Sequence, residues 1–231
     1  LEKGKLTLRD ADVRFWRAVY DEKIQRMDNQ FGQFLSAFEK LGLTDKTLFV
    51  LTSDHGTEFY EHRRFDHGFT LYDELIHVPL AIKLPGQIDG KVIGDRISSI
   101  DIMPTILDLL DVQISAKART QLRGTSLSST MQGERSTRNI FSETDYRDYT
   151  FKRAIITPNG WKLIYTLEDQ RRELYYLPED PGETQNLAGQ MAKRADQLQS
   201  QLFTHYKSIG QDLQGKTWRR GLKPVYRSQA K

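Results

Sequence analysis

Hydrophobic residues recur every three or four positions between residues 13 and 41, which is the period of one face of a helix. We therefore predict one long helix, capped at its start by Thr7 or Asp10 and ended at Gly42. Residues 47–52 are then apolar at consecutive positions, which indicates a strand covered on both faces in a parallel sheet. The helical face consists of Val13, Trp16, Tyr20, Ile24, Met27, Phe31, Phe34, Phe38 and Leu41.

A second strand and a shorter helix follow this pair. Residues 78–84 predict a strand with Pro79 at its beginning or on a sheet edge, and residues 101–110 predict a helix that begins with an Asp cap. A polar connection over residues 113–138 separates this part from the rest of the chain. A helix followed by a buried strand is the unit of an α/β fold, so we expect part of a mostly parallel sheet flanked by helices.

The second half of the chain has the pattern of a small antiparallel subdomain. Short β-branched and aromatic runs predict strands at residues 139–142, 153–157, 161–165 and 173–177, with a hairpin turn at residues 158–160. Residues 187–202 then repeat apolar side chains with helical spacing. We predict three parts: half of an α/β domain over residues 1–125, an antiparallel α+β subdomain over residues 126–214, and a basic tail over residues 215–231.

Composition excludes several classes of protein. No apolar run approaches the roughly 18 residues of a membrane span, so none is predicted. The net charge of +3 over 231 residues argues against a dedicated nucleic-acid binder. The chain has no cysteine, which excludes disulfides and thiolate metal ligands.

The candidate chemistry lies where the first strand ends, at Asp54-His55-Gly56. Open α/β sheets bind ligands at the carboxyl ends of their strands, and a glycine lets the backbone turn away at once. A carboxylate and an imidazole side by side are suitable donors for a divalent cation. The sequence therefore predicts half of a metal site at Asp54 and His55.

Four of the five histidines fall between positions 55 and 77, which favours a site in this segment. His67 precedes a second glycine and could stabilise charge or donate a proton there. Arg63 and Arg64 could face an anionic substrate, although a solvated charged run has the same pattern. His62 is predicted to be a solvated loop residue.

Residues 52–79, TSDHGTEFYEHRRFDHGFTLYDELIHVP, resemble the sulfatase branch of the alkaline phosphatase superfamily. In that branch a strand ending in T-S-D-H-G or T-S-D-N-G is followed by a basic residue and a Y-x-E-x-x-x-V-P stretch. Tyr72 and Glu74 match this last stretch, where we expect them to cap and pack a helix. Further blocks that resemble the family occupy residues 20–50, 97–112, 159–165, 173–177 and 180–187.

The resemblance implies a hydrolase that cleaves sulfate esters, with one divalent metal ion bound by Asp54 and His55. Calcium is the metal that the resemblance favours, whereas manganese and zinc are admissible from the donor types. His67 stands where family members carry a lysine or histidine that touches the ester group, and Arg63 and Arg64 would bind the same anionic substrate. An exported or periplasmic location is implied in the same way.

The family's nucleophile lies in a C-x-P-x-R or S-x-P-x-R motif near the amino terminus, after a pair of metal-binding aspartates. Neither motif occurs in this chain. We therefore expect the chain to be a carboxy-terminal portion that needs an amino-terminal half of the catalytic domain as its partner and is inactive alone. Two alternatives stay open: a phosphodiester or phosphonate ester hydrolase or phosphoryl transferase of the same superfamily, and a truncated, non-catalytic binding module.

Overall fold

A computed structural model of the chain describes residues 7–146 and 150–214. The chain divides into two compact units, Leu1–Lys91 and Val92–Lys231, which are described separately below. The predicted basic tail, residues 215–231, lies outside the described residues. None of the described helices has both the length and the apolar character that crossing a membrane requires.

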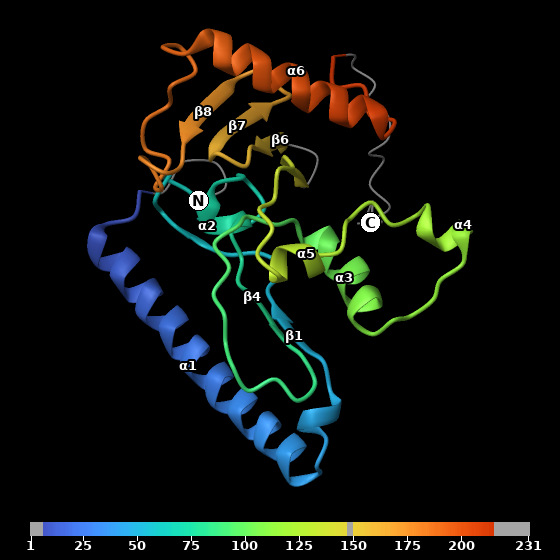
Figure 1. Cartoon of the computed structure of the whole chain (residues 1–231). Helices are drawn as coiled ribbons and strands as arrows, with labels where there is room; N and C mark the ends of the chain where they lie inside the picture. The colour runs from blue at the N-terminus through green and yellow to red at the C-terminus, as the bar shows by residue number, and fades with distance from the viewer. Residues whose placement is uncertain (1–6, 147–149, 215–231) are drawn as a thin grey trace, which may run out of the picture. The chain divides into compact units, whose positions relative to one another are not determined.

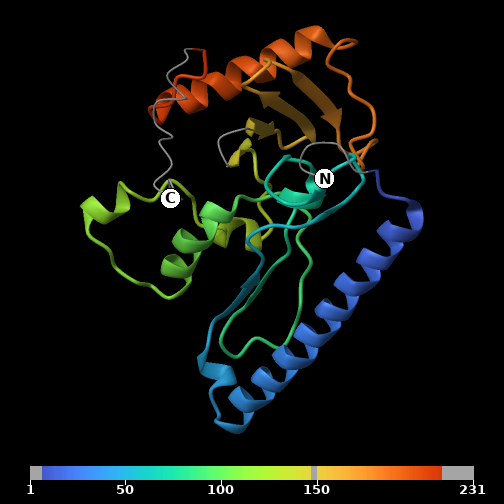
Figure 2. The same cartoon turned by 180° about the vertical axis from the view of Figure 1, so that it is seen from behind.

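The predicted long helix is confirmed as α1, Asp10–Lys40, in the first unit (Figure 1). Its start is capped by neither Thr7 nor Asp10: the carboxylate of Asp12 reaches back to accept the backbone N–H of Arg9 at 3.0 Å. Its end is followed by Gly42 with φ at 67°, a left-handed conformation that glycine adopts without strain. The chain returns through the short 3-10 helix η1, Thr44–Lys46, into strand β1, Phe49–Thr52 (Figure 2).

The predicted parallel sheet is not seen in the part of the chain that the structure describes. Strand β1 pairs antiparallel with β4, Leu80–Lys83, which begins directly after Pro79. Leu51 in β1 is 48% exposed, so this strand is not covered on both faces within the described residues. A consecutive apolar run shows that both faces are apolar but carries no information about the direction of the neighbouring strand.

A hairpin and a short helix connect β1 to β4. Strands β2, Glu58–Phe59, and β3, Phe65–Asp66, pair antiparallel, and α2 spans Asp73–Ile76. The hairpin packs on α1 through edge-to-face aromatic contacts, in which Tyr20 lies 5.1 Å from Phe59 between ring centroids. These contacts place the hairpin against the amino-terminal half of α1.

The second unit begins with a helical segment organised by the buried Asp101. It contains η2, Ser99–Asp101, and the helices α3, Ile102–Leu109, α4, Ala116–Arg119, and α5, Ser128–Met131. The Asp101 carboxylate accepts the N–H of Ser98 at 3.2 Å, the N–H of Thr125 at 2.8 Å and the guanidinium of Arg138 at 2.7 Å. Asp101 stands at the predicted N-cap position of α3, but its side chain makes no cap hydrogen bond there. Its carboxylate instead connects the helix to Thr125 and Arg138.

The predicted antiparallel subdomain is confirmed as a four-stranded meander with one helix. The strands are β5, Ile140–Tyr146, β6, Thr150–Ile156, β7, Trp161–Thr166, and β8, Arg172–Tyr176, paired in that order. Helix α6, Ala192–Ser208, lies across the sheet (Figure 1). Side chains such as Ile155 and Leu163 of the sheet and Leu198 and Leu202 of α6 are fully buried and form the core between them.

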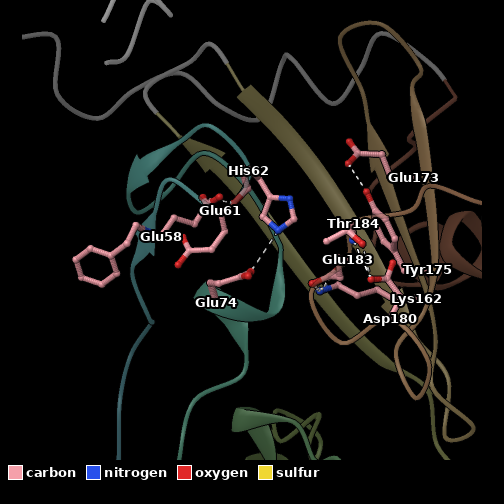
Figure 3. Close-up of polar contacts among 12 residues, drawn as sticks. Glu58, Glu61, His62, Glu74, Lys162, Glu173, Tyr175, Asp180, Glu183 and Thr184 are labelled. Carbon is pink, nitrogen blue, oxygen red and sulfur yellow. Dashed lines mark hydrogen bonds and ion pairs between the residues drawn. The ribbon is translucent and has the colours of Figure 1, made fainter. Parts of the chain in front are cut away.

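The sheet face turned away from α6 carries buried charge. Side chains alternate along a strand, so Lys162 points opposite to its core neighbour Leu163. Its ammonium lies 2.8 Å from one carboxylate oxygen of Glu183, and both side chains are fully buried. Asp180 shapes the loop that presents Glu183, because its carboxylate accepts the N–H and the hydroxyl of Thr184 at 3.0 Å each (Figure 3).

We predict that Lys162→Met destabilises the chain by about 3–5 kcal/mol, since it leaves the Glu183 carboxylate buried without its cation. The double variant Lys162→Met with Glu183→Leu should recover most of that loss, because no buried charge remains. Urea unfolding of the two single variants and the double variant measures both effects. Lys193→Met, at an exposed position of α6, is the matched control and should change stability by less than about 0.5 kcal/mol. A double variant as unstable as the sum of the two singles would contradict the pairing.

Candidate functional site

The turn after β1 is built by local hydrogen bonds and by one close backbone contact. Asp54 Oδ1 accepts the N–H of His55 at 2.9 Å, and the Ser53 hydroxyl donates to the His55 carbonyl at 2.8 Å. The N–H of Gly56 donates to the carbonyl of Leu75 at 2.9 Å. A Cβ on Gly56 would lie 2.0 Å from the carbonyl oxygen of Glu74, so only glycine fits here. The end of α2 therefore fixes the turn that presents Asp54 and His55.

The hydrogen bond of the His55 ring determines which nitrogen faces the carboxylate. Nδ1 lies 2.8 Å from the Gly56 carbonyl oxygen, which can only accept, so Nδ1 carries the proton and Nε2 keeps a lone pair in the neutral ring. Nε2 lies 3.7 Å from Oδ2 of Asp54, and the Asp54 side chain is 86% exposed. Metal–ligand distances are about 2.0–2.6 Å, so one cation can contact both atoms. The two residues fit a divalent cation as two of its ligands.

No third histidine, aspartate or glutamate side chain completes a metal-binding group with them within residues 7–146 and 150–214. There, no group of three or more histidine, aspartate or glutamate side chains is gathered closely enough to hold a metal ion. Hard divalent cations take six or more ligands, many of them oxygens. Metal binding by Asp54 and His55 therefore stays a prediction, and further ligands would have to complete the site.

His67 lies directly against this pair. Its ring is stacked on the ring of His55, with 4.1 Å between centroids and 21° between planes. Its Nδ1 lies 2.6 Å from Oδ1 of Asp66, and a carboxylate oxygen only accepts, so Nδ1 carries the proton. Asp66 has a φ of 79°, which is uncommon outside glycine. The structure thus brings together the three residues that the sequence singles out as ligands and substrate contact.

Asp66 is a site residue that the sequence prediction missed, although the sequence carries a signal for it. Residues 66–68 read Asp-His-Gly, as residues 54–56 do. The two pairs differ in structure, because Asp54 accepts the backbone N–H of the following histidine whereas Asp66 accepts its ring. A carboxylate that holds a histidine ring fixes its tautomer and orientation.

The two arginines lie in the turn between β2 and β3, and both are exposed. Arg63 has a left-handed φ of 59°, and the guanidinium of Arg64 lies 5.9 Å from the centroid of the Phe69 ring. The exposed guanidinium groups in this turn are accessible to an anion. Contact between either arginine and a substrate stays a prediction.

His62 is not the solvated loop residue that its charged neighbours suggest. Its side chain is 12% exposed and its ring is stacked on Tyr72, with 3.6 Å between centroids. Its Nε2 lies 3.5 Å from Oε2 of Glu74 (Figure 3). Stacking on the apolar face of Tyr72 buries the His62 ring, although the residues next to it in the sequence are charged. Tyr72 and Glu74 pack here, in line with the packing role expected for them.

Glu58 lies in the same group and is fully buried. Burial raises the pKa of the Glu58 carboxyl to about 7, and the nearby carboxylates of Glu74 and Glu61 act in the same direction. The hydrogen bond from Thr70 and the charge of His62 oppose this rise. Figure 3 shows Glu58, Glu61 and His62 of the hairpin gathered with Glu74 of α2. A buried carboxyl beside the candidate site is not predictable from the local sequence pattern.

Comparison with known proteins identifies the family. Residues 15–112 match the model of the family described as Sulfatase. This part of the chain is a sulfatase-family domain. Arylsulfatase K of Xenopus laevis is 28% identical over 206 residues, which are 84% of this chain and 37% of that protein. N-acetylglucosamine-6-O-sulfatase of Bacteroides thetaiotaomicron is 30% identical over 208 residues, which are 85% of this chain and 36% of that protein.

Solved structures of sulfatases share the fold. A Bacteroides thetaiotaomicron protein described as a sulfatase superposes with a TM-score of 0.78 at 26% identity, over 93% of this chain and 46% of that chain. A second structure, solved in complex with its substrate D-glucosamine-2-N,6-O-disulfate, has a TM-score of 0.74 at 26% identity over the same shares of the two chains. The chain thus spans less than half the length of the sulfatases that it matches. Hydrolysis of sulfate esters is the activity of this family.

We predict that Gly56→Ala destabilises the chain by about 1–3 kcal/mol, because its methyl group overlaps the Glu74 carbonyl oxygen and forces the turn away from α2. The matched control is Gly32→Ala in α1, where a Cβ meets nothing within 4 Å and helix propensity should add about 1 kcal/mol of stability. Thermal unfolding of both variants measures the contrast. Equal effects of the two substitutions would show that the turn does not depend on its contact with α2.

Proposed function

We propose that this chain is the part of a sulfatase that supplies two metal ligands, Asp54 and His55, and one substrate-binding histidine, His67. The observation that carries the proposal is the arrangement of these three side chains: Asp54 Oδ2 and His55 Nε2 lie 3.7 Å apart, and the His67 ring is stacked on His55. The likeness to sulfatases supports the reaction class, hydrolysis of a sulfate ester. Activity belongs to an enzyme that contains this chain together with a nucleophile.

A divalent cation held by Asp54 and His55 would neutralise the oxygens of the ester and lower the pKa of the nucleophile. Within this chain, Asp54 Oδ1 accepts the N–H of His55, so Oδ2 would be the oxygen that binds the cation. The Gly56 carbonyl keeps the proton on Nδ1 of His55, so that Nε2 is the donor atom. Calcium is the expected metal, and manganese or zinc would be accepted by the same donors.

His67 would act on the transferring sulfate group. Its Nδ1 proton is committed to Asp66, so Nε2 is the atom that meets the ester. A protonated Nε2 can stabilise negative charge on the sulfate oxygens or give a proton to the leaving oxygen. The exposed Arg63 and Arg64 add positive charge near the hairpin and would favour an anionic substrate.

We predict that Asp54→Ala and His55→Ala each lower the bound metal and the sulfate ester hydrolysis of the active enzyme together. The loss of activity should correspond to several kcal/mol of transition-state stabilisation. Metal content by elemental analysis and the rate on an aryl sulfate are the two measurements. Asp45→Ala, on the neighbouring helix η1, is the control and should leave both unchanged. Full activity and full metal content in Asp54→Ala would exclude the site.

For His67 we predict a different result, because this residue contacts substrate rather than metal. His67→Ala should lower kcat on a sulfate ester by roughly a hundredfold or more with metal content unchanged. His67→Lys should restore part of the loss, since lysine supplies a cation at the same place. The control is His77→Ala, an exposed histidine beyond α2. A rate and pH profile of His67→Ala equal to those of the parent would assign His67 a structural role only.

A further inference from the structure

Glu58 is a fully buried carboxyl whose burial the proposed reaction does not explain. It lies in β2 and has no exposed surface. Oε2 accepts the hydroxyl of Thr70 at 2.5 Å, and Oε1 has no hydrogen-bond partner among the described residues. Burying a carboxyl with a single hydrogen bond costs stability. The burial of Glu58 is better explained by the residues that it holds in place than by a contribution to stability.

Two connections run from Glu58 to the segment that carries His67. The pairing of β2 with β3 places Glu58 directly opposite Asp66, the residue whose carboxylate holds the His67 ring. The hydroxyl that Glu58 accepts belongs to Thr70, three residues beyond His67. Glu58 is therefore joined to the chain on both sides of His67, before it through the strand pair and after it through a side-chain hydrogen bond.

This segment needs such support because its backbone is strained. Asp66 has a φ of 79°, a conformation that costs a non-glycine residue free energy and persists only when neighbouring contacts fix it. Gly68 also has a positive φ, of 94°. Residues with positive φ thus stand on both sides of His67, and the ring orientation depends on the contacts that fix this backbone.

We propose that Glu58 is a positioning residue for His67: by binding Thr70 and pairing with Asp66, it fixes the segment 66–70 so that the His67 ring stays stacked on His55. The proposed effect of Glu58 on the position of His67 does not require His67 to take part in a reaction. Its consequence for sulfate ester hydrolysis rests on the proposed function.

The surroundings of Glu58 are compatible with this role in either protonation state. His62 provides a favourable charge, whereas Glu61 and Glu74 provide unfavourable ones. The pKa of about 7 means that both forms of Glu58 are populated near neutral pH. Oε2 can accept the Thr70 hydroxyl in both forms, so the anchor survives the change of charge.

The test uses variants that break or keep this one hydrogen bond. Thr70→Val removes the donor with little change of shape, and Glu58→Leu removes the acceptor. Thr70→Ser keeps the hydroxyl. Glu74→Gln alters a neighbouring carboxyl of the same group without touching Thr70, and is the matched control for charge.

The measurement is nitrogen-15 NMR of the histidine rings in the full 231-residue chain, assigned by single histidine replacements. In the parent we expect His67 to have its proton on Nδ1 and to show a nuclear Overhauser contact with the His55 ring. Thr70→Val and Glu58→Leu should both weaken this contact and shift the Nδ1 resonance toward the value of a free imidazole. The double variant should be no worse than the worse single variant, whereas Thr70→Ser and Glu74→Gln should match the parent.

An unchanged His67 in folded Thr70→Val would overturn the proposal, and so would an equal disturbance in Glu74→Gln. If Glu58→Leu does not fold, the comparison of Thr70→Val with Thr70→Ser decides alone. In the active enzyme, Thr70→Val should lower kcat by roughly tenfold or more with metal content unchanged, as expected for a misplaced catalytic group. A displaced His67 with an unchanged kcat would support the positioning by Glu58 and contradict the role of His67 in the reaction.

Discussion

The close approach of Gly56 to the end of helix α2 is the contact on which the candidate site depends. The N–H of Gly56 donates to Leu75, and a Cβ at this position would overlap the carbonyl oxygen of Glu74. This contact holds the turn against α2 and thereby fixes the direction in which Asp54 and His55 leave the end of β1. The carbonyl of Gly56 then orients the His55 ring, so the same residue sets the position and the tautomer of a candidate ligand.

His67 depends on this turn through a longer series of contacts. Its ring rests on His55, its Nδ1 is held by Asp66, and Asp66 is paired with the buried Glu58. The hairpin that carries these residues is packed on α1 by aromatic rings rather than by ion pairs alone. The candidate site is therefore a set of short polar contacts supported by apolar packing, next to the buried carboxyl of Glu58.

Sequence periodicity predicted the elements whose signals are local. The face of α1, the strands of the meander and helix α6 follow from the spacing of apolar residues, and Asp54 and His55 follow from a strand that stops at Asp-His-Gly. The resemblance to sulfatases, carried by ordered blocks along the chain, is confirmed by the family match. Each of these predictions depends only on residues that are close together in the sequence.

What the sequence could not predict are contacts between residues far apart in the chain. The direction of β4 beside β1, the contacts of Asp101 with Thr125 and Arg138, and the burial of His62 on Tyr72 all depend on packing between separate segments. The pair of Lys162 and Glu183 is another example, because each residue alone has the pattern of a solvated charge. The predicted boundary at residue 125 stays a prediction, while the compact units divide at Lys91 and hydrogen bonds of Asp101 reach Arg138.

The central claim is that Asp54 and His55 are ligands of one divalent cation with His67 beside them. The most direct measurement is a crystal structure of an enzyme containing this chain, soaked with manganese and recorded near the manganese absorption edge. The account predicts an anomalous peak within about 2.0–2.6 Å of Asp54 Oδ2 and His55 Nε2, with the His67 ring still stacked on His55. A peak at other residues, or His55 turned so that Nε2 faces away from a bound ion, would contradict it.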